Sequence, residues 1–341
     1  MSGTSTTGTT GTTGILITGI GTALPGVEGP SDLLRAAGLP RDPAAPAVDP
    51  AALIGKRGLR YKDRASQLAL CAARAALLDA GLLDGEAAAD GALTVPGTSV
   101  AVVVSSNLGN LDTVCEVADG IRAEGVTGIS PMGLPNASSN VIASSVAIRH
   151  GLRGPNLMVC NGATSGVDAV HWGAAMLRAG RAQRALVIGV ETHNRQVEWL
   201  LGRPAGELLD GAVALLLERA PAAAGRGAAG IAALGPYARE AGVEECVRRL
   251  LTASGGRPGS WYVPEGHRDA SPAALSGVAR TDLTERFGSA SGALGVLQCA
   301  TAARGLALPP AGEPGTALVT SGTDRDDASA GMVLLAVEAS A

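Results

Sequence analysis

The stretch Gly-Pro-Asn-Leu-Met-Val-Cys-Asn-Gly-Ala-Thr-Ser-Gly-Val, residues 154–167, decides the fold of this 341-residue chain. It predicts a short apolar strand at Leu157–Cys160, a tight turn, and a helix over Thr164–Ala179. The turn residue Ala163 is then aimed at the positive end of the helix, where backbone N–H groups stabilise a thiolate or an oxyanion. Such a turn suits an activated nucleophile, but the methyl side chain of Ala163 cannot be one.

Short apolar runs alternate with Ala-rich stretches on both sides of this segment. The other predicted strands are Ile15–Ile20, Val100–Ser105, Arg184–Val190, Val213–Glu218, Gly230–Leu234, Trp261–Val263, Ala317–Thr320 and Met332–Val337. The other predicted helices are Ala65–Ala80, Asp112–Ala123, Ser138–Arg149, Val243–Thr252 and Ala290–Arg304. Because most strands are continuous rather than alternating apolar runs, we expect sheets covered on both faces in an α/β fold.

Composition excludes several classes of function. The chain has 46% hydrophobic residues but only 2% aromatic ones, so its core is built from Ala, Val, Leu and Ile. A net charge of −4 argues against a general nucleic-acid binder. No long uncharged apolar run or signal sequence is visible, which predicts a soluble, cytoplasmic protein without a membrane segment. The five scattered cysteines indicate neither a disulfide framework nor a zinc site, and we expect no metal or cofactor.

Several ordered motifs around the turn carry a resemblance to a known family. They are Ile-Leu-Ile-Thr-Gly-Ile-Gly at 15–21, Gly-Lys-Arg-Gly-Leu-Arg-Tyr-Lys-Asp-Arg at 55–64, Ile-Ser-Pro-Met-Gly-Leu-Pro-Asn at 129–136 and Asp-Gly-Ala-Val-Ala-Leu-Leu-Leu-Glu at 210–218. Together with residues 154–167, they resemble the β-ketoacyl synthase family over roughly residues 14 to 220. The resemblance implies the thiolase fold, in which two similar βα halves form five alternating layers, α-β-α-β-α.

The resemblance also suggests how the chain is divided. Residues 1–14 form a Ser/Thr/Gly run that we expect to be a disordered tail. The ketosynthase-like halves then correspond to residues 15–210 and 211–341. The second half is shorter than in a typical ketosynthase.

The family's catalytic positions are altered in this chain. A condensing ketosynthase uses a cysteine, two histidines and two backbone N–H donors, and Ala163 occupies the cysteine's position. His267, in the run Glu-Gly-His at 265–267, is the best match to the first histidine, although the glycines and threonines that follow in the family are missing. Ser289 takes the position of the second histidine, and the charged loop at 321–328 replaces a glycine-rich turn. We therefore expect no independent condensation.

Within the family, a subunit without the cysteine resembles the chain length factor of type II polyketide synthases. That resemblance implies a ketosynthase partner in a heterodimer, an acyl carrier protein that docks through the partner, and a role in shaping the acyl tunnel. Leu108 matches a gating position, and Met132 and Leu134 lie in the segment that approaches the partner's pocket. All three also fit ordinary interface or core residues. Alanine at 163, where aromatic-polyketide members carry glutamine, suggests a branch that makes reduced or polyene chains.

Two other interpretations stay open. One is an acyltransferase or decarboxylase of the same fold with a relocated nucleophile, Cys160 or Ser165, although a small buried hydrophobe is the favoured interpretation of Cys160. The other is a stand-alone homodimer that binds an acyl chain or an acyl carrier protein without catalysis.

Overall fold

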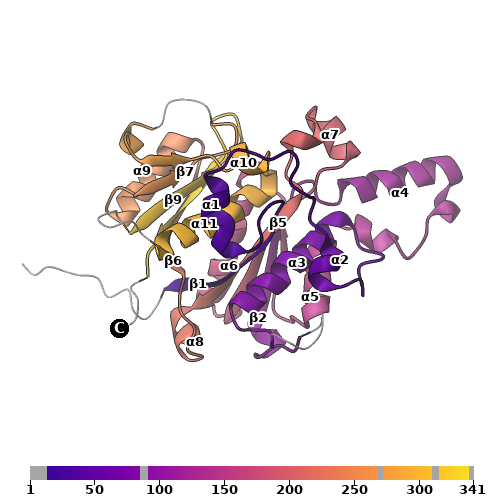
Figure 1. Ribbon diagram of the computed structural model, residues 1–341, viewed down its shortest axis with the longest axis horizontal. Helices are drawn as coiled ribbons and strands as arrows, with labels where there is room; N and C mark the ends of the chain where they lie inside the picture. The colour runs from indigo at the N-terminus through magenta and orange to yellow at the C-terminus, as the bar shows by residue number, and fades with distance from the viewer. Residues whose placement is uncertain (1–13, 85–90, 268–271, 309–314, 338–341) are drawn as a thin grey trace, which may run out of the picture.

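Ten strands form the framework of the molecule (Figure 1). The computed structural model describes residues 14–84, 91–267, 272–308 and 315–337, so the predicted tail, apart from Gly14, lies outside the described residues. The strands of the first half are β1 (Ile15–Ala23), β2 (Val100–Ser105), β3 (Asn156–Val159), β4 (Arg184–Glu191) and β5 (Gly211–Arg219). Those of the second half are β6 (Ala232–Glu240), β7 (Ser260–Tyr262), β8 (Ala279–Thr281), β9 (Thr316–Ser321) and β10 (Ser329–Leu335).

The order of the strands repeats between the halves. The sheet runs β3-β2-β4-β5-β1-β6-β10-β9-β7-β8, so each half, numbered along its own chain, has the order 3-2-4-5-1. Parallel and antiparallel neighbours also correspond: β2 lies parallel to β3 and β4, and β7 lies parallel to β8 and β9. The halves meet where β1 pairs antiparallel with β6 through three residue pairs. Two similar βα halves are therefore present.

The changeover between the halves lies later in the chain than the predicted boundary after residue 210. The strand β5 begins at Gly211, but it pairs with β1 and β4 of the first half along its full length. By strand pairing, the halves therefore divide between Arg219 and Ala232.

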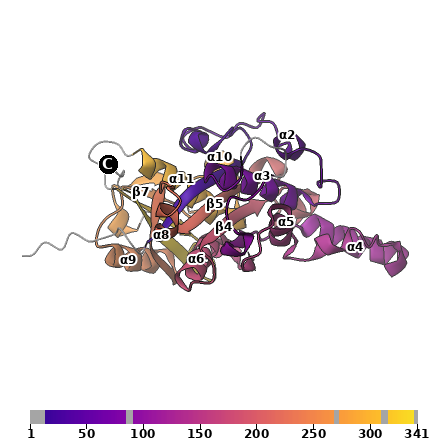
Figure 2. The same ribbon diagram turned by 90° about the horizontal axis from the view of Figure 1, so that it is seen from below.

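Helices complete the layers on both sides of the sheet and between its halves (Figures 1 and 2). The helices α3 (Arg64–Asp79) and α5 (Val141–His150) cover the first half, and α9 (Val243–Ser254) packs on β6 and β10 of the second. Between them, α6 (Ser165–Arg178) and α11 (Leu294–Ala307) contact each other and strands of both halves. This order of helices, sheet, helices, sheet and helices is the five-layered arrangement of the thiolase fold.

The central helices approach each other at glycines. A Cβ atom added to Gly166 would lie 2.5 Å from the backbone nitrogen of Gly295, and one added to Gly295 would lie 2.2 Å from the nitrogen of Val167. Only glycine permits this spacing between backbones. The close contact brings the N-terminal ends of α6 and α11 to one place in the molecule.

The buried strands confirm the pattern seen in the sequence, although the ends of β6 and β10 differ and the edge strand β8 was not predicted. Every residue of β2 and of β4 is buried, as expected for strands covered on both faces. The strand β6 runs to Glu240, six residues beyond the predicted end at Leu234. The register between β6 and β10 shifts at Met332 and Leu334, which leaves Pro236 outside the paired positions and lets the strand continue past it.

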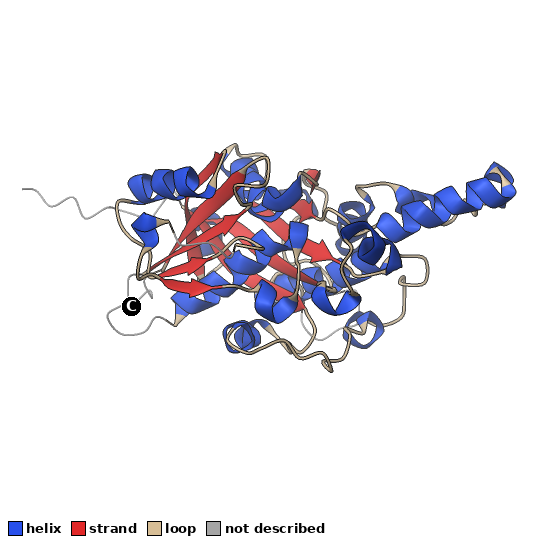
Figure 3. Ribbon diagram, turned by 90° about the horizontal axis from the view of Figure 1, so that it is seen from above, coloured by secondary structure: helices blue, strands red, loops and turns tan. Residues whose placement is uncertain are grey.

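An arm projects from the first half (Figure 3). It contains the 14-residue helix α4 (Leu111–Glu124), none of whose residues is buried, and the 3₁₀ turns Val126–Gly128 and Leu134–Ala137. The shorter helices are α1 (Leu33–Ala37), α2 (Pro50–Ile54), α7 (Arg195–Leu201), α8 (Ala220–Ala224) and α10 (Thr284–Phe287). Within the described part of the chain, every helix is too short or too polar to cross a lipid bilayer.

Candidate functional site

A cavity of about 580 Å³ lies where the N-terminal ends of α6 and α11 meet. It combines residues from several loops: Asn107, Leu108, Cys160, Gly162, Ala163, Leu201, Arg203, Glu265, Gly266, Ser289, Ser291, Leu294, Gly322 and Asp326. The structure thus brings together four residues that the sequence singled out, Leu108, Cys160, Ala163 and Ser289. They come from three segments that are far apart in the chain, and the fold makes these segments neighbours.

The turn before α6 is built as the sequence predicts. Gly162 has φ of +85°, which glycine adopts without strain, and a 3₁₀ turn at Gly162–Thr164 leads into the helix. The half-buried Ala163 lines the cavity with its methyl group. The Ser165 hydroxyl is buried inside the turn, where it accepts from the Asn161 N–H at 2.9 Å and lies 2.8 Å from the Gly162 carbonyl oxygen. This hydroxyl is engaged by the turn itself.

Cys160 is exposed rather than buried, contrary to the interpretation favoured from the sequence. The strand β3 ends one residue earlier, at Val159, so the thiol emerges at the cavity. Its sulfur lies 3.9 Å from the Asn107 carbonyl oxygen. Partial burial, together with the nearby Glu191 carboxylate, raises the pKa of the Cys160 thiol. Because the thiolate is the nucleophile, this environment weakens the reactivity of Cys160.

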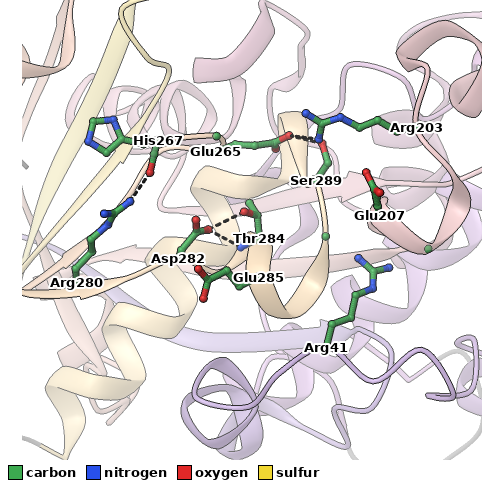
Figure 4. Close-up of a pocket in the computed structure, with 13 residues that line it drawn as sticks. Arg41, Arg203, Glu207, Glu265, His267, Arg280, Asp282, Thr284, Glu285 and Ser289 are labelled. Atoms are coloured by element: carbon green, nitrogen blue, oxygen red, sulfur yellow. Dashed lines mark hydrogen bonds and ion pairs between the residues drawn. The ribbon is translucent and has the colours of Figure 1, made fainter. Parts of the chain in front are cut away.

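Ser289 faces a carboxylate that the sequence analysis did not single out (Figure 4). The Ser289 hydroxyl donates to Glu265, and the other Glu265 oxygen accepts from the N–H groups of Ala290 and Ser291, both at 2.9 Å. Arg203 lies 3.7 Å from the same carboxylate. Glu265 therefore occupies the N-terminal end of the segment that leads into α11, where a negative charge is stabilised.

His267 does not join this group. Its ring packs edge-on against Trp261, with 5.4 Å between ring centroids, and its carbonyl oxygen accepts from Arg280. Figure 4 shows its side chain pointing away from Ser289, with Glu265 between them. It lines a neighbouring cavity of about 720 Å³, which shares Glu265 and Ser289 with the first. Glu265 stands in the same Glu-Gly-His run, from which the match to the family histidine selected His267.

Leu108 and the two other predicted tunnel residues lie in different places. Leu108 lines the cavity beside Ala163. Met132 and Leu134 lie in the arm, where they are 65% and 50% exposed. Their exposure in the isolated chain is compatible with contact to another protein.

The loop after β9 closes one side of the cavity. Gly322 lines the cavity with φ of +81°, and a Cβ atom there would lie 2.2 Å from the Ala328 carbonyl oxygen, so the turn requires glycine. The Asp326 carboxylate accepts from the Thr323 N–H at 2.7 Å and fixes the loop. Among the described residues, no group of three or more His, Cys, Asp or Glu side chains is placed to hold a metal ion.

Comparison with proteins of known sequence relates the chain to condensing enzymes. It is 28% identical over 217 residues to the 3-oxoacyl-[acyl-carrier-protein] synthase 2 of Vibrio harveyi, which covers 57% of this chain and 49% of that protein. It is 31% identical over 196 residues to the granaticin polyketide putative β-ketoacyl synthase 1 of Streptomyces violaceoruber, covering 52% and 46%. The chain thus spans about half of the length of these relatives, or less.

Solved structures show the same fold over nearly the whole chain. The ishigamide ketosynthase/chain length factor matches with a TM-score of 0.74 and 24% identity, covering 95% of this chain and 99% of that one. A type II polyketide synthase ketosynthase, AntDE, in complex with the acyl carrier protein AntF matches with a TM-score of 0.76 and 15% identity, covering 96% and 100%. The family described as "Beta-ketoacyl synthase, N-terminal domain" matches residues 44–220, just over half of the chain. The chain therefore belongs to the β-ketoacyl synthase family.

Proposed function

We propose that this chain is a non-catalytic, chain-length-factor-like subunit that pairs with a ketosynthase and shapes the acyl tunnel of a type II polyketide synthase. One observation carries the proposal. Ala163 lines the cavity at the turn before α6, where the family's cysteine would accept the acyl chain. With a methyl group there, the acyl-enzyme bond cannot form at this position. The partner ketosynthase would form it and carry out decarboxylative Claisen condensation.

The second helix start supports the same conclusion. Ser289 stands where the family has a histidine, and its hydroxyl is hydrogen-bonded to Glu265. The Glu265 carboxylate in turn accepts two backbone N–H bonds and lies beside Arg203. A serine cannot supply a histidine's proton transfer at neutral pH.

The arm supports a partner chain of the same fold. An isolated helix of 14 residues is marginal in water, yet α4 buries none of its residues. Its apolar residues Val114 and Ile121 are 41% and 44% exposed, and Val126 beyond it is 77% exposed. A second ketosynthase-fold chain that covered the arm, including Met132 and Leu134, would bury this surface.

An acyl carrier protein is expected because one of the structurally similar proteins is bound to one. The AntDE structure contains a type II polyketide synthase acyl carrier protein bound to its ketosynthase. We infer that a carrier protein delivers chains to the partner's nucleophile, while Leu108 and neighbouring residues of this chain limit the space for them. A reduced or polyene product and a cytoplasmic location stay predictions.

Acyl transfer through Cys160 is the second candidate, because its thiol does reach the cavity. The raised pKa of that thiol weighs against it, and the engaged Ser165 hydroxyl offers no better nucleophile. Intact-protein mass spectrometry after incubation with acyl-pantetheine thioesters separates the two functions. We expect no acyl adduct on the wild type, whereas an adduct that the Cys160→Ala variant loses would establish the relocated nucleophile.

A further inference from the structure

The loop that carries Leu108 is held by a buried carboxylate, Glu191. This residue ends β4 and is only 3% exposed. Its Oε1 atom accepts from the N–H groups of Asn107 at 2.6 Å and Gly292 at 3.0 Å. Its Oε2 atom accepts from the Leu108 N–H at 3.1 Å and the Ser106 hydroxyl at 3.2 Å. All four donors are uncharged, so the ionised carboxylate is bound by dipoles alone.

These donors belong to different walls of the cavity. Asn107 and Leu108 come from the loop after β2, and Gly292 comes from the 3₁₀ turn before α11. The Asn107 side chain extends the connection to a third wall, because its Nδ2 donates to the Gly162 carbonyl oxygen and to the Ser291 hydroxyl, both at 2.9 Å. One carboxylate and one amide therefore link the three segments around Ala163.

The backbone is shaped to admit this carboxylate. A Cβ atom on Gly292 would lie 2.8 Å from Oε1 of Glu191 and 3.0 Å from the Asn107 nitrogen. A Cβ atom on Gly109 would lie 2.5 Å from the Ser106 hydroxyl oxygen. Next to Gly292, Ser291 has φ of +40°, and among the described residues it is the one non-glycine residue with positive φ. Strain of this kind persists only where the surroundings hold it in place.

We propose that the Glu191 carboxylate is the positioning residue of the cavity: it fixes the loop of residues 106–108 to the turn before α11 and so sets where Leu108 stands. The positioning of Leu108 by Glu191 is inferred from these hydrogen bonds alone. An effect of Glu191 on the length of the product would in addition rest on the proposed function.

Protonation would weaken this hold, because only the ionised form can accept all four hydrogen bonds. Burial raises the pKa of Glu191 to about 7, against the lowering effect of its hydrogen bonds. Two other ionisable groups come near. Cys160, from the turn after β3, keeps its proton at neutral pH because its own pKa is raised, and Glu265 binds Ala290 and Ser291 at the same helix end. With Glu191 still buried, lowering the pH through 7 should therefore weaken the hold on Leu108.

Protonation of Glu191 should loosen the loop of residues 106–108 but raise the free energy of unfolding of the whole chain. The folded-state pKa of Glu191 lies above the ordinary value of 4.5, so the native protein takes up its proton between about pH 7 and pH 4.5. The contribution of Glu191 to the free energy of unfolding therefore increases on acidification, while the loop it holds becomes less ordered. A general loss of structure at low pH would instead lower both the order of the loop and the free energy of unfolding.

Hydrogen–deuterium exchange of the full-length chain at pH 6 and pH 8, corrected for intrinsic rates, tests the proposal. A group with a pKa near 7 is about 90% protonated at pH 6 and about 10% protonated at pH 8. We expect peptides covering residues 106–110 to exchange several-fold faster at pH 6. In Glu191→Gln they should exchange fast at both values. In the control Glu265→Gln they should behave as in the wild type, with faster exchange confined to residues 289–292.

Equal protection of residues 106–110 at both pH values, with Glu191→Gln like the wild type, would overturn the proposal. If Glu191→Gln does not fold, Ser106→Ala, which removes one of the four donors, decides and should show a smaller increase in the exchange of residues 106–110. Faster exchange in Glu191→Gln with unchanged product length in a reconstituted pair would support the positioning of Leu108 and contradict the tunnel-shaping function.

Discussion

The starts of α6 and α11 occupy corresponding places in the two halves, yet one presents an apolar side chain and the other binds carboxylates. Each follows the third strand of its half, begins with a 3₁₀ turn and leads into a 14-residue helix. At α6, the cavity is lined by the methyl group of Ala163. At α11, the Glu265 and Glu191 carboxylates accept N–H groups of three successive residues, Ala290, Ser291 and Gly292.

Under the proposed function, this difference separates what the fold keeps from what the chemistry loses. The close approach of the two helices and the cavity between their starts are present, and we propose that this cavity is a place for an acyl chain. The nucleophile is absent from one start, and carboxylates occupy the other. Substitutions at each start can therefore separate packing from chemistry.

The largest effect is expected from the contact that brings both starts together. Gly295→Leu places side-chain atoms against the backbone of Val167, which is 2.2 Å from the position of an added Cβ. Overpacking typically costs 1–3 kcal/mol, and a backbone clash should cost about 3 kcal/mol or more. Urea unfolding measures the loss. The control is Gly305→Ala in the same helix, where the nearest atom is 3.5 Å away and we expect a gain of about 0.5 kcal/mol.

An effect of intermediate size is expected at the start of α11. Glu265→Ala leaves the Ala290 and Ser291 N–H groups and the Ser289 hydroxyl without their acceptor, which should lower the free energy of unfolding by about 2 kcal/mol. Glu285→Ala removes an exposed carboxylate that lines the neighbouring cavity and should leave the unfolding curve unchanged. Equal curves for both variants would mean that Glu265 contributes nothing as a cap.

A chemical effect is expected at the start of α6. In Ala163→Cys, a thiol would stand at the N-terminal end of a 14-residue helix, where thiol pKa values are lowered. We expect alkylation by iodoacetamide of position 163, measured in a Cys160→Ala, Ala163→Cys variant, to be at least about tenfold faster than that of Cys160 in the wild type. One pKa unit changes the thiolate fraction by about that factor. A slower reaction would show that the turn no longer stabilises negative charge.

The sequence predicted the start of α6 better than the start of α11. A strand, a glycine turn and a helix follow one another over residues 154–178, so local pattern was sufficient to place Ala163. The family resemblance also pointed to Ser289, as the position of the second histidine, and this residue lines the cavity. The two carboxylates at this helix start were missed, because Glu265 lies 24 residues from Ser289, and Glu191 is 101 residues from Gly292. Contacts over such distances depend on strand order, which no local periodicity contains.

The duplication was invisible for the same reason. The two halves share the order 3-2-4-5-1, but their sequences do not repeat in a way that pattern analysis detects. The displaced end of β6 and the exposure of Cys160 depend on a register shift and on where β3 ends. Such details depend on pairing between distant segments.

The central claim, that this chain shapes a tunnel without catalysing condensation, is tested most directly in a reconstituted pair. The chain would be co-expressed with a candidate ketosynthase partner, and product amount and chain length would be measured for the wild type, Leu108→Ala and Cys160→Ala. We predict a stable heterodimer, a changed chain length with Leu108→Ala, and an unchanged product with Cys160→Ala. Acyl transfer or elongation by this chain alone, abolished by Cys160→Ala, would contradict the claim.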